Sequence, residues 1–345
     1  MTPLSIWAPY GASAPSVRVR ISGWGASIPE LSAAGAFHSF TDAGAWMGLK
    51  SQPVSLLRAH RDIRKKIGAA VPCRTSLVHR EISPFSRGGL ECRALSIGQR
   101  AVYDVDDALP HDPSALRRRR SLRAASRSDV VLAGNDYLME LYSELGCTTA
   151  YVPSCVDTSG GPAPLGPRRD ERVTFGWIGS ATTIPYLETL APLFADPQVR
   201  QNARFAVMGP PTLPPSLSRL VDHTPWSVES ERAFLAGCDV GMMPLPDDAW
   251  SRGKCAYKLL QFASVGRTFI ASPVGANDAL VRRSGAMAAT TLDEWRDAVI
   301  EVATMGAERL TELGRRAYDT VDESYSYASW VPTVRELLDL RPIPA

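Results

Sequence analysis

The chain contains 345 residues, of which 45% are hydrophobic and 21% are charged, and its formal net charge is +2. This length predicts two α/β domains, and the small net charge does not indicate nucleic-acid binding. No apolar run approaches membrane-spanning length, and the N-terminus reads as a strand and not as a signal peptide. Six scattered cysteines form no CxxC or Cys/His cluster, so neither disulfides nor zinc are expected, and a cytoplasmic location with at most peripheral membrane contact fits.

The first half of the chain alternates short apolar runs with helical patterns. Leu4–Ala8 is the first predicted strand, a loop with Gly11 follows, and a helical stretch from about Ser16 to Ala33 carries Arg18 and Arg20. Further strands are expected at Phe37–Phe40, Thr75–His79, Ala101–Asp104, Val130–Ala133 and Ala150–Val152. Helices are expected at Pro53–Ile67, Pro113–Ser126 and Asn135–Leu145. This alternation predicts a parallel sheet with crossover helices.

The second half repeats the alternation after Asp157–Glu171, a Gly- and Pro-rich stretch without an apolar period that predicts a linker. Its strands are expected at Val173–Ile178, Arg204–Met208, Leu220–His223, Val240–Met243, Thr268–Ala271 and Ala286–Ala289. Its helices are expected at Pro185–Phe194, Val228–Ala236, Tyr257–Val265, Leu292–Met305 and Glu308–Val321. The last amphipathic piece, Tyr327–Leu340, is expected to brace the first domain.

These patterns predict an α/β fold of two Rossmann-like, doubly wound domains. Their expected bounds are residues 1–156, a linker at 157–171, a second domain at 172–325 and a returning helix within 326–345. Ligands of such folds bind at the carboxyl ends of the strands, so we expect a cleft there.

The segment Asp239–Gly275 carries the clearest candidate site. A buried strand is followed by a turn, and Arg252, Gly253 and Lys254 then stand at the mouth of a helix, with Lys258 on the same helical face as Lys254. Backbone N–H groups and positive charge at a helix N-terminus suit a phosphate. The alternative is an ordinary βαβ unit with solvated lysines.

The turn Phe175–Ser180 offers a second anion site. Gly176 and Gly179 allow close approach of backbone to a ligand, while Ser180 and Thr182, with Thr183, cap the next helix or bind a phosphate. Together with the basic segment this turn suits a pyrophosphate. The alternative is a glycine turn needed for packing alone.

The segment Thr224–Glu229 joins another strand to another helix. Trp226 is placed to stack on a nucleobase, and Ser227 resembles an N-cap. Glu229 is either a ligand contact or a first-turn acid that favours the helix dipole.

Two segments of the first half end strands with polar residues. His79 is expected to point into the cleft or to be a structural histidine, and Arg80 and Glu81 are candidates for structural ion pairs. Asp104, Asp106 and Asp107 favour substrate hydroxyls or loop structure over a metal.

A run of basic residues, Arg117–Arg120, is expected to be a solvated face, or alternatively a contact for acidic lipid or an anionic acceptor. GxSxG, Walker A and an early GxGxxG are all absent from the sequence, which argues against a serine hydrolase, a P-loop enzyme and a nicotinamide or flavin enzyme.

Taken together, these segments resemble the family 4 glycosyltransferases of the GT-B type. The resemblance is strongest from Val173 to about Asn277, through FGWIGS, the W-S-x-E piece, DVGMMPL, the WSRGK-x3-KLLQ run and ASPVGAN. The first half matches more loosely through VHRE, YDVDDA and the Arg-containing segment after the first strand.

The resemblance implies a retaining transfer of a sugar from a nucleotide-diphosphate sugar, UDP- or GDP-linked, with no metal and no other cofactor. The donor lies on the second domain in this family, and the acceptor, a glycan, a lipid-linked molecule or a small molecule, lies on the first. The residues that this places on the acceptor side are Gly11, Arg18, Asp104, Asp106 and Asp107.

The family's motifs assign roles to individual residues of this sequence. The turn role falls to Gly179 and Ser180, the diphosphate contacts fall to Lys254 and Lys258 with Arg252 close by, and His79 matches the histidine that reaches the donor sugar.

Two positions depart from the family's Glu-x7-Glu motif. Gly253 stands where the first acid contacts the donor sugar, and Gln261 stands where the second commonly holds the ribose. The usual Arg and Lys of the glycine turn are also missing, so the basic segment is expected to supply that charge.

With no obvious carboxylate nucleophile, retention fits a front-face route in which the leaving phosphate accepts the acceptor's proton. The alternatives are a nucleotide-sugar epimerase or hydrolase of the same architecture, and a non-catalytic GT-B-like partner subunit. The Ala, Arg and Pro usage is typical of a GC-rich bacterium.

Overall fold

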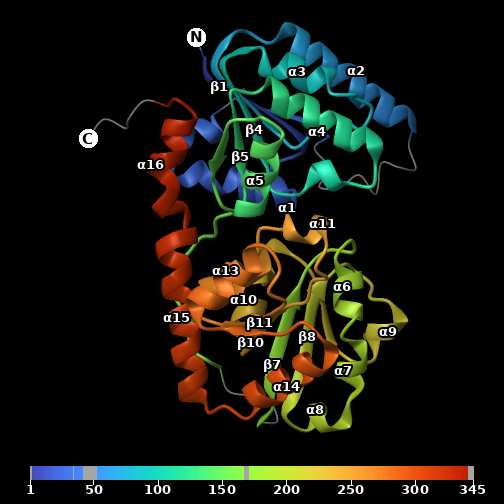
Figure 1. The fold of residues 1–345 in the computed structure, drawn as a ribbon, viewed down its shortest axis with the longest axis vertical. Coiled ribbons are helices and arrows are strands. Elements are labelled where there is room, and N and C mark those ends of the chain that lie inside the picture. The colour runs from blue at the N-terminus through green and yellow to red at the C-terminus, as the bar shows by residue number, and fades with distance from the viewer. Residues whose placement is uncertain (1, 34, 42–52, 167–170, 341–345) are drawn as a thin grey trace. The chain divides into compact units, whose positions relative to one another are not determined.

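The computed structural model describes residues 2–33, 35–41, 53–166 and 171–340 (Figure 1). The chain forms two compact units, each built on its own six-stranded sheet in which every described strand pair is parallel. Unit 1 comprises Met1–Cys155, Arg252–Cys255 and Tyr327–Ala345. Unit 2 comprises Val156–Ser251 and Ala256–Ser326. Both units are therefore discontinuous in sequence, and the short segment Arg252–Cys255 groups with unit 1.

The sheet of unit 1 has the strand order β2-β1-β3-β4-β5-β6. Its strands are β1 Thr2–Tyr10, β2 Phe37–Thr41, β3 Cys73–His79, β4 Gly98–Val105, β5 Val130–Ala133 and β6 Thr149–Tyr151. Its helices are α1 Pro15–Arg20, α2 Pro53–Ala69, α3 Gly89–Leu95, α4 Ala115–Arg127, α5 Asp136–Glu144 and α16 Tyr327–Leu337. The register pairs His79 with Asp104, so the polar ends of β3 and β4 lie side by side.

Two features of unit 1 differ from the sequence prediction. The helix expected from Ser16 to Ala33 is wrong, because α1 ends at Arg20 and two short 3-10 helices, Ser22–Ala26 and Pro29–Ser32, follow it. Glycines and a proline interrupt the stretch, and both residue types are poor helix formers. The helix α3 was not expected.

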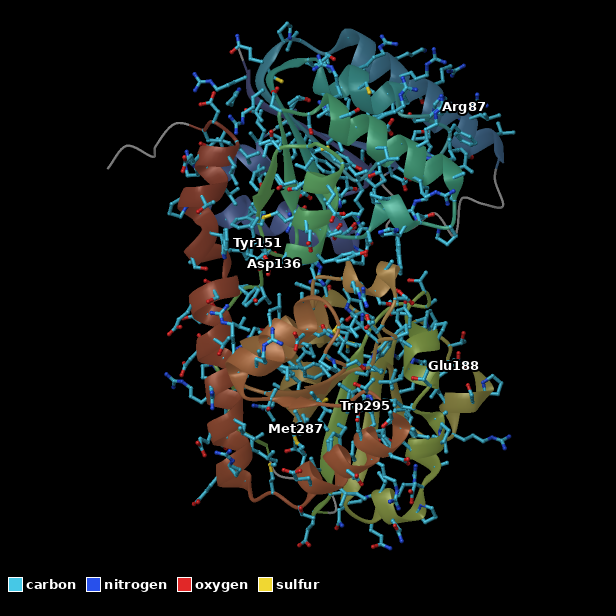
Figure 2. The ribbon with its side chains drawn as sticks, in the orientation of Figure 1. Arg87, Asp136, Tyr151, Glu188, Met287 and Trp295 are labelled. Atoms are coloured by element: carbon cyan, nitrogen blue, oxygen red, sulfur yellow. The ribbon has the colours of Figure 1, made fainter. Side chains whose placement is uncertain are left out.

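The core of unit 1 includes α16 from the far end of the chain. Val334 and Leu338 are buried with Leu4, Ile6 and other strand residues in one apolar cluster. Tyr151 of β6, labelled in Figure 2, meets Trp330 of α16 edge to face with ring centroids 5.4 Å apart. The C-terminal helix is therefore an integral part of the unit that begins the chain.

The sheet of unit 2 has the order β12-β11-β10-β7-β8-β9. Its strands are β7 Val173–Ile178, β8 Ala203–Gly209, β9 Asp222–Pro225, β10 Val240–Met243, β11 Thr268–Ala271 and β12 Met287–Ala288. Its helices are α6 Ile184–Glu188, α7 Ala191–Ala195, α8 Pro197–Asn202, α9 Pro215–Ser218, α10 Val228–Gly237, α11 Ala249–Arg252, α12 Tyr257–Ser264, α13 Ala276–Ser284, α14 Leu292–Ala303 and α15 Ala307–Tyr325. Trp295 of α14, labelled in Figure 2, is buried among the apolar residues of β7 and β8.

The helices of unit 2 correct the prediction in two places. The helix expected at Pro185–Phe194 is two helices, α6 and α7, and the strand expected at Leu220–His223 begins later, at Asp222. The expected strands Val173–Ile178, Val240–Met243 and Thr268–Ala271 have the observed bounds of β7, β10 and β11. Fully buried strands are the best predicted elements here because their apolar runs are uninterrupted.

The stretch predicted as a linker, 157–171, is held against unit 2 in its described part, whereas residues 167–170 lie outside the described residues. Arg267 is 1% exposed and donates hydrogen bonds to the carbonyls of Ala163 (2.7 Å) and Pro164 (2.8 Å). Ala163 N–H in turn donates to Val265 O at 3.0 Å. This part of the chain is thus anchored by one buried guanidinium.

Candidate functional site

The carboxyl end of β7 brings together a glycine turn, an aromatic ring and a lysine. Trp177 is 1% exposed, and its ring lies so close to Gly179 that any side chain at that position would overlap it. Lys258, the second residue of α12, places its Nζ over the same ring, 5.4 Å from the centroid. A lysine in this position interacts favourably with the electron-rich face of an indole. Of the basic residues Arg252, Lys254 and Lys258 that the sequence indicated as an anion site, Lys258 therefore lies beside the glycine turn at one edge of one sheet.

The turn after β7 is held by one hydrogen bond to strand β8 and one within the turn. The backbone N–H of Gly179 donates to Met208 O at 3.0 Å, and that of Ser180 donates to Thr183 Oγ1 at 3.1 Å. The hydroxyls of Ser180 and Thr182, both exposed residues, lie 2.8 Å apart. The expected capping by Ser180 and Thr182 side chains is wrong, because Thr183 is the N-cap of α6 and that helix has no side-chain cap. Two exposed hydroxyls remain at the sheet edge.

The neighbouring strand β8 leads to the segment with Trp226. Trp226 is 36% exposed, its backbone N–H donates to Gly209 O at 2.9 Å, and its Nε1 donates to Glu231 at 2.7 Å. The ring is thus fixed at one edge while part of its surface stays accessible, as a stacking platform requires.

Helix α10 starts as the sequence predicts. Ser227 is its N-cap and accepts from Ser230 N–H, and Glu229 is its second residue. The backbone and the Ser227 hydroxyl hold the pKa of Glu229 below its usual value. The exposed Glu229 carboxylate is therefore ionised at the helix N-terminus, which favours the dipole. Gln261 is 5% exposed, within α12.

The carboxyl ends of β3 and β4 in unit 1 hold a buried charge cluster. Asp104 accepts from Arg20 Nε at 3.1 and 3.2 Å, also from Arg20 Nη2, and lies 2.7 Å from His79 Nδ1. Arg20 Nη1 donates to Val152 O at 2.7 Å. Burial by itself would raise the pKa of Asp104, but the charge of Arg20 and the hydrogen bond with His79 lower it to about 2. Asp104 is thus an ionised carboxylate that orients the imidazole.

Only one of the two ring nitrogens of His79 has a hydrogen-bond partner in this cluster. The side chain has no exposed surface, and its Nε2 has no hydrogen-bond partner among the described residues. Native structures leave few buried polar atoms without a partner, so such an atom is commonly functional or takes up a water. With Nδ1 facing Asp104, the tautomer that carries a proton on Nδ1 leaves Nε2 as an acceptor.

A second network joins the carboxylates after β4 to basic residues. Arg80 has a left-handed backbone (φ 54°), pairs with Asp106, and its Nη2 lies 2.8 Å from Asp107. Lys254 Nζ lies 3.4 Å from the same Asp107 carboxylate. Burial raises the pKa of Asp106, and Arg80 with its neighbours more than offsets this and lowers it. Each of the three carboxylates of the DVDD segment is therefore paired with a cation. This agrees with a role in the structure of the loop, one of the two roles that the sequence indicated.

The position of Lys254 corrects the expected helical pairing with Lys258. Helix α12 begins only at Tyr257, its N-cap Ala256 has φ 53°, and Lys254 belongs to unit 1 whereas Lys258 belongs to unit 2. Spacing of four along the chain thus does not put the two lysines on one helical face. Arg252 ends α11 and is exposed.

The segment Arg252–Cys255 is fixed within unit 1 by Asn135. Asn135 Nδ2 donates to the carbonyls of Arg252 (3.1 Å) and Lys254 (3.0 Å), while its Oδ1 caps α5. Gly253 packs so tightly that a Cβ there would lie 2.6 Å from the backbone N of Ala108. A side chain at position 253 would overlap Ala108 in this backbone, so the packing observed here requires glycine.

Arg120 corrects the expectation that Arg117–Arg120 is a solvated face. Its side chain is 2% exposed, pairs with Glu81, and its Nε donates to Ser86 O at 3.0 Å. Arg117 also pairs, with Asp112 at 2.5 Å. These two arginines hold unit 1 together, and so cannot serve as a free patch for lipid or acceptor.

The remaining acceptor-side candidates, Gly11 and Arg18, come shortly after β1 along the chain. Gly11 is buried directly after β1, and Arg18 is half-buried on α1. Among the described residues, no group of three or more His, Cys, Asp or Glu side chains is arranged to hold a metal ion, and all six cysteines are free.

Sequence reasoning missed three residues that build these sites: Arg20, Asn135 and Trp177. Two of them form contacts between residues far apart in the chain, such as Arg20 with Asp104, 84 positions away. Trp177 was detectable, because strand alternation puts it on the same face as Gly179.

Comparison with solved structures defines the class of fold. The chain superposes on Anabaena Alr3699/HepE in complex with UDP-glucose with a TM-score of 0.68 and 12% identity, covering 97% of this chain and 98% of that one. A trehalose-6-phosphate structure from E. coli with UDP-2-fluoro glucose gives 0.59 and 11% identity over 84% and 79% of the chains. S. aureus TarM with UDP gives 0.58 and 11% over 76% and 55%.

The architecture is therefore GT-B, with two Rossmann-like domains. The sequence matches no protein-family model, and no curated protein matches it in sequence. Within the described residues, no helix has both the length and the apolarity needed to cross a bilayer.

Proposed function

We propose that the protein is a retaining glycosyltransferase that moves a sugar from a UDP- or GDP-linked donor to an acceptor hydroxyl, without a metal or other cofactor. The observation that carries this proposal is the meeting of Gly179, Trp177 and Lys258 at the carboxyl edge of the unit 2 sheet. The GT-B architecture supports it, because the structures of that fold named above hold UDP or a UDP-sugar.

Lys258 takes the role of the diphosphate ligand in this proposal. Negative charge grows on the leaving diphosphate as the glycosidic bond breaks, and a fixed ammonium stabilises it by a few kcal/mol in a dry site. The exposed hydroxyls of Ser180 and Thr182 donate to the same phosphates, and Trp226 stacks on the base. Glu229 and Gln261 remain candidates for donor contacts.

The role of His79 at the donor sugar stays a prediction from the family resemblance. Asp104 holds its ring at Nδ1, and its buried Nε2 has no hydrogen-bond partner among the described residues. A front-face route, in which the leaving phosphate takes the acceptor's proton, requires no carboxylate nucleophile. Gly253 offers no such group, and the roles of Arg252, Lys254, Gly11, Arg18, Asp106 and Asp107 stay predictions from the family resemblance. We place the reaction in the cytoplasm, with a glycan, lipid-linked or small-molecule acceptor.

Donor binding tests the role of Lys258. Isothermal titration with UDP and GDP is expected to show binding of one of them, and Lys258→Ala should weaken it at least about tenfold, because a charge-assisted hydrogen bond is worth about 1.5–3 kcal/mol. Lys65→Ala, at an exposed lysine of α2, is the matched control and should bind like the parent. Equal affinity in Lys258→Ala would overturn the assignment.

Turnover separates the proposal from its alternatives. The protein is incubated with nucleotide sugars of whichever nucleotide binds, and the products are followed by proton NMR. We expect free or transferred sugar whose anomeric configuration is retained. An epimerised nucleotide sugar would indicate the epimerase. Tight binding without any turnover, with or without acceptors, would indicate the non-catalytic partner.

A further inference from the structure

A cavity in unit 2 lies at the amino ends of its strands, away from the proposed donor site. It has a volume of about 110 Å³ and is lined by Arg172, Arg200, Arg204 and Arg219, together with Phe205 and Asp222 among others. Arg172 directly precedes β7, Arg204 is the second residue of β8, and Asp222 opens β9. Since about 10–15 Å³ of such volume holds one water, the cavity has room for a phosphate-sized group.

Three of the four arginines are held in place by the fold. Arg172 Nη1 donates to Arg200 O at 3.4 Å. Arg200 Nη1 donates to the carbonyls of Phe194 (3.0 Å) and Leu220 (3.1 Å), which ties α8 to the segment before β9. Arg204 pairs with Asp222, and its side chain is 14% exposed. These contacts fix the walls of the cavity, so its charges are positioned before any ligand arrives.

Arg219 differs from the other three because its guanidinium has no contact of this kind with the described part of the chain. The residue is exposed, directly after α9, and its side chain makes no hydrogen bond or ion pair with any described residue. Its placement in the lining of the cavity is therefore not explained by a stabilising role in the fold.

Basic residues predominate in the lining. Four arginines, whose guanidinium groups stay protonated in proteins, line the cavity together with one aspartate. Like charges gathered in a concave surface repel one another and focus a positive potential, which an anion relieves. Arginine forks match the oxygens of a phosphate in particular, because two N–H groups bind two oxygens at once.

We propose that this arginine cavity binds a phosphate-bearing anion at a site separate from the donor site. Strand β7, with 6 residues, separates the two edges by about 20 Å, since a strand rises about 3.3 Å per residue. The proposal does not depend on the proposed glycosyl transfer. The phosphate belongs either to a soluble molecule or to a lipid headgroup, and the chemistry of recognition is the same.

Titration with inorganic phosphate tests the site in the full-length protein. We expect saturable binding that Arg219→Gln weakens about tenfold, while Arg309→Gln, at an exposed arginine of α15, leaves the affinity within about twofold. Binding lost in Lys258→Ala but kept in Arg219→Gln would overturn the proposal, because it would place the phosphate in the donor site. Arg219→Gln should keep the parent's melting temperature, since the residue is exposed.

A vesicle experiment distinguishes the two sources of phosphate. Sedimentation with vesicles of anionic phospholipid, compared with phosphatidylcholine alone, should show Arg219-dependent binding if a headgroup is the ligand, and none if the ligand is soluble. If neither phosphate nor anionic vesicles distinguish the parent from Arg219→Gln, the cavity is not an anion site.

Discussion

At the scale of single residues, Gly253 is a position where the packing leaves no room for a side chain. The position lies against the backbone of Ala108, where the Cβ of any other residue would come within 2.6 Å of the backbone N. The glycine is therefore tied to the way Arg252–Cys255 packs within unit 1.

Gly253→Ala is expected to destabilise unit 1 by about 1–3 kcal/mol, because added atoms in a tightly packed site force the backbone to shift. Urea denaturation followed by circular dichroism measures the effect. Gly237→Ala, where a Cβ would meet nothing within 4 Å, is the matched control and should change stability by less than about 0.5 kcal/mol. An unchanged free energy of unfolding in Gly253→Ala would show that the segment can shift to make room for the added methyl group.

Asp104 is the residue on which pH dependence is expected to rest. Its pKa of about 2 in the folded state lies below the value of about 3.9 in an unfolded chain. The ionised pair with Arg20 therefore stabilises the fold above about pH 4, and this contribution is lost as pH falls toward about 2.

Asp104→Asn should cost about 3–5 kcal/mol near neutral pH, because it leaves a buried Arg20 uncompensated. The difference in unfolding free energy between parent and variant should shrink as the pH falls from about 4 to about 2. Asp319→Asn, at a surface pair on α15, should cost under about 1 kcal/mol. A difference that stays constant with pH would contradict the assignment.

At the scale of elements, helix ends decide where side chains of the candidate site fall. Helix α12 starts after the left-handed residue Ala256, so Lys258 and not Lys254 occupies its first turn. Helix α14 begins with a capping box, in which Thr291 accepts from Glu294 N–H and the Glu294 side chain accepts from Thr291 N–H. The Thr291–Glu294 capping box satisfies backbone N–H groups that would otherwise lack partners.

Thr291→Ala is expected to lower stability by about 1 kcal/mol, since it removes the acceptor for an N-terminal N–H of α14. Thermal unfolding of unit 2, with and without UDP, measures the change. Thr291→Ser keeps the acceptor and should behave like the parent. If serine and alanine were equally destabilising, the hydroxyl would not be the relevant group.

At the scale of the whole molecule, the chain forms two cores, and its C-terminal helix packs back into the core of unit 1. Helix α16 contributes Val334 and Leu338 to the core of unit 1, and Arg335 pairs with Glu30 at 2.7 Å. Thr75 Oγ1 also donates to Leu338 O at 2.6 Å.

Truncation after Ser326 should therefore destabilise unit 1 by several kcal/mol, because burying each large apolar side chain contributes about 1.5–3 kcal/mol. Unit 2 retains its own core and is expected to keep nucleotide binding. Calorimetry and UDP or GDP titration of the truncated and full-length proteins measure both effects. Unchanged unfolding of unit 1 would show that α16 is dispensable, and loss of nucleotide binding would show that unit 2 depends on it.

The sequence by itself determined the α/β class, most strands and helices, and the candidates Gly179, Ser227 and Lys258. These follow from local patterns, namely uninterrupted apolar runs, caps and glycine turns, which a short window of chain contains. Only the tertiary structure decided the partners of the charged residues: that Asp104 pairs with Arg20, that Arg120 is buried, and that Lys254 groups with unit 1. The physical reason is that a charge has no preferred partner until the fold brings distant segments together and removes water from between them.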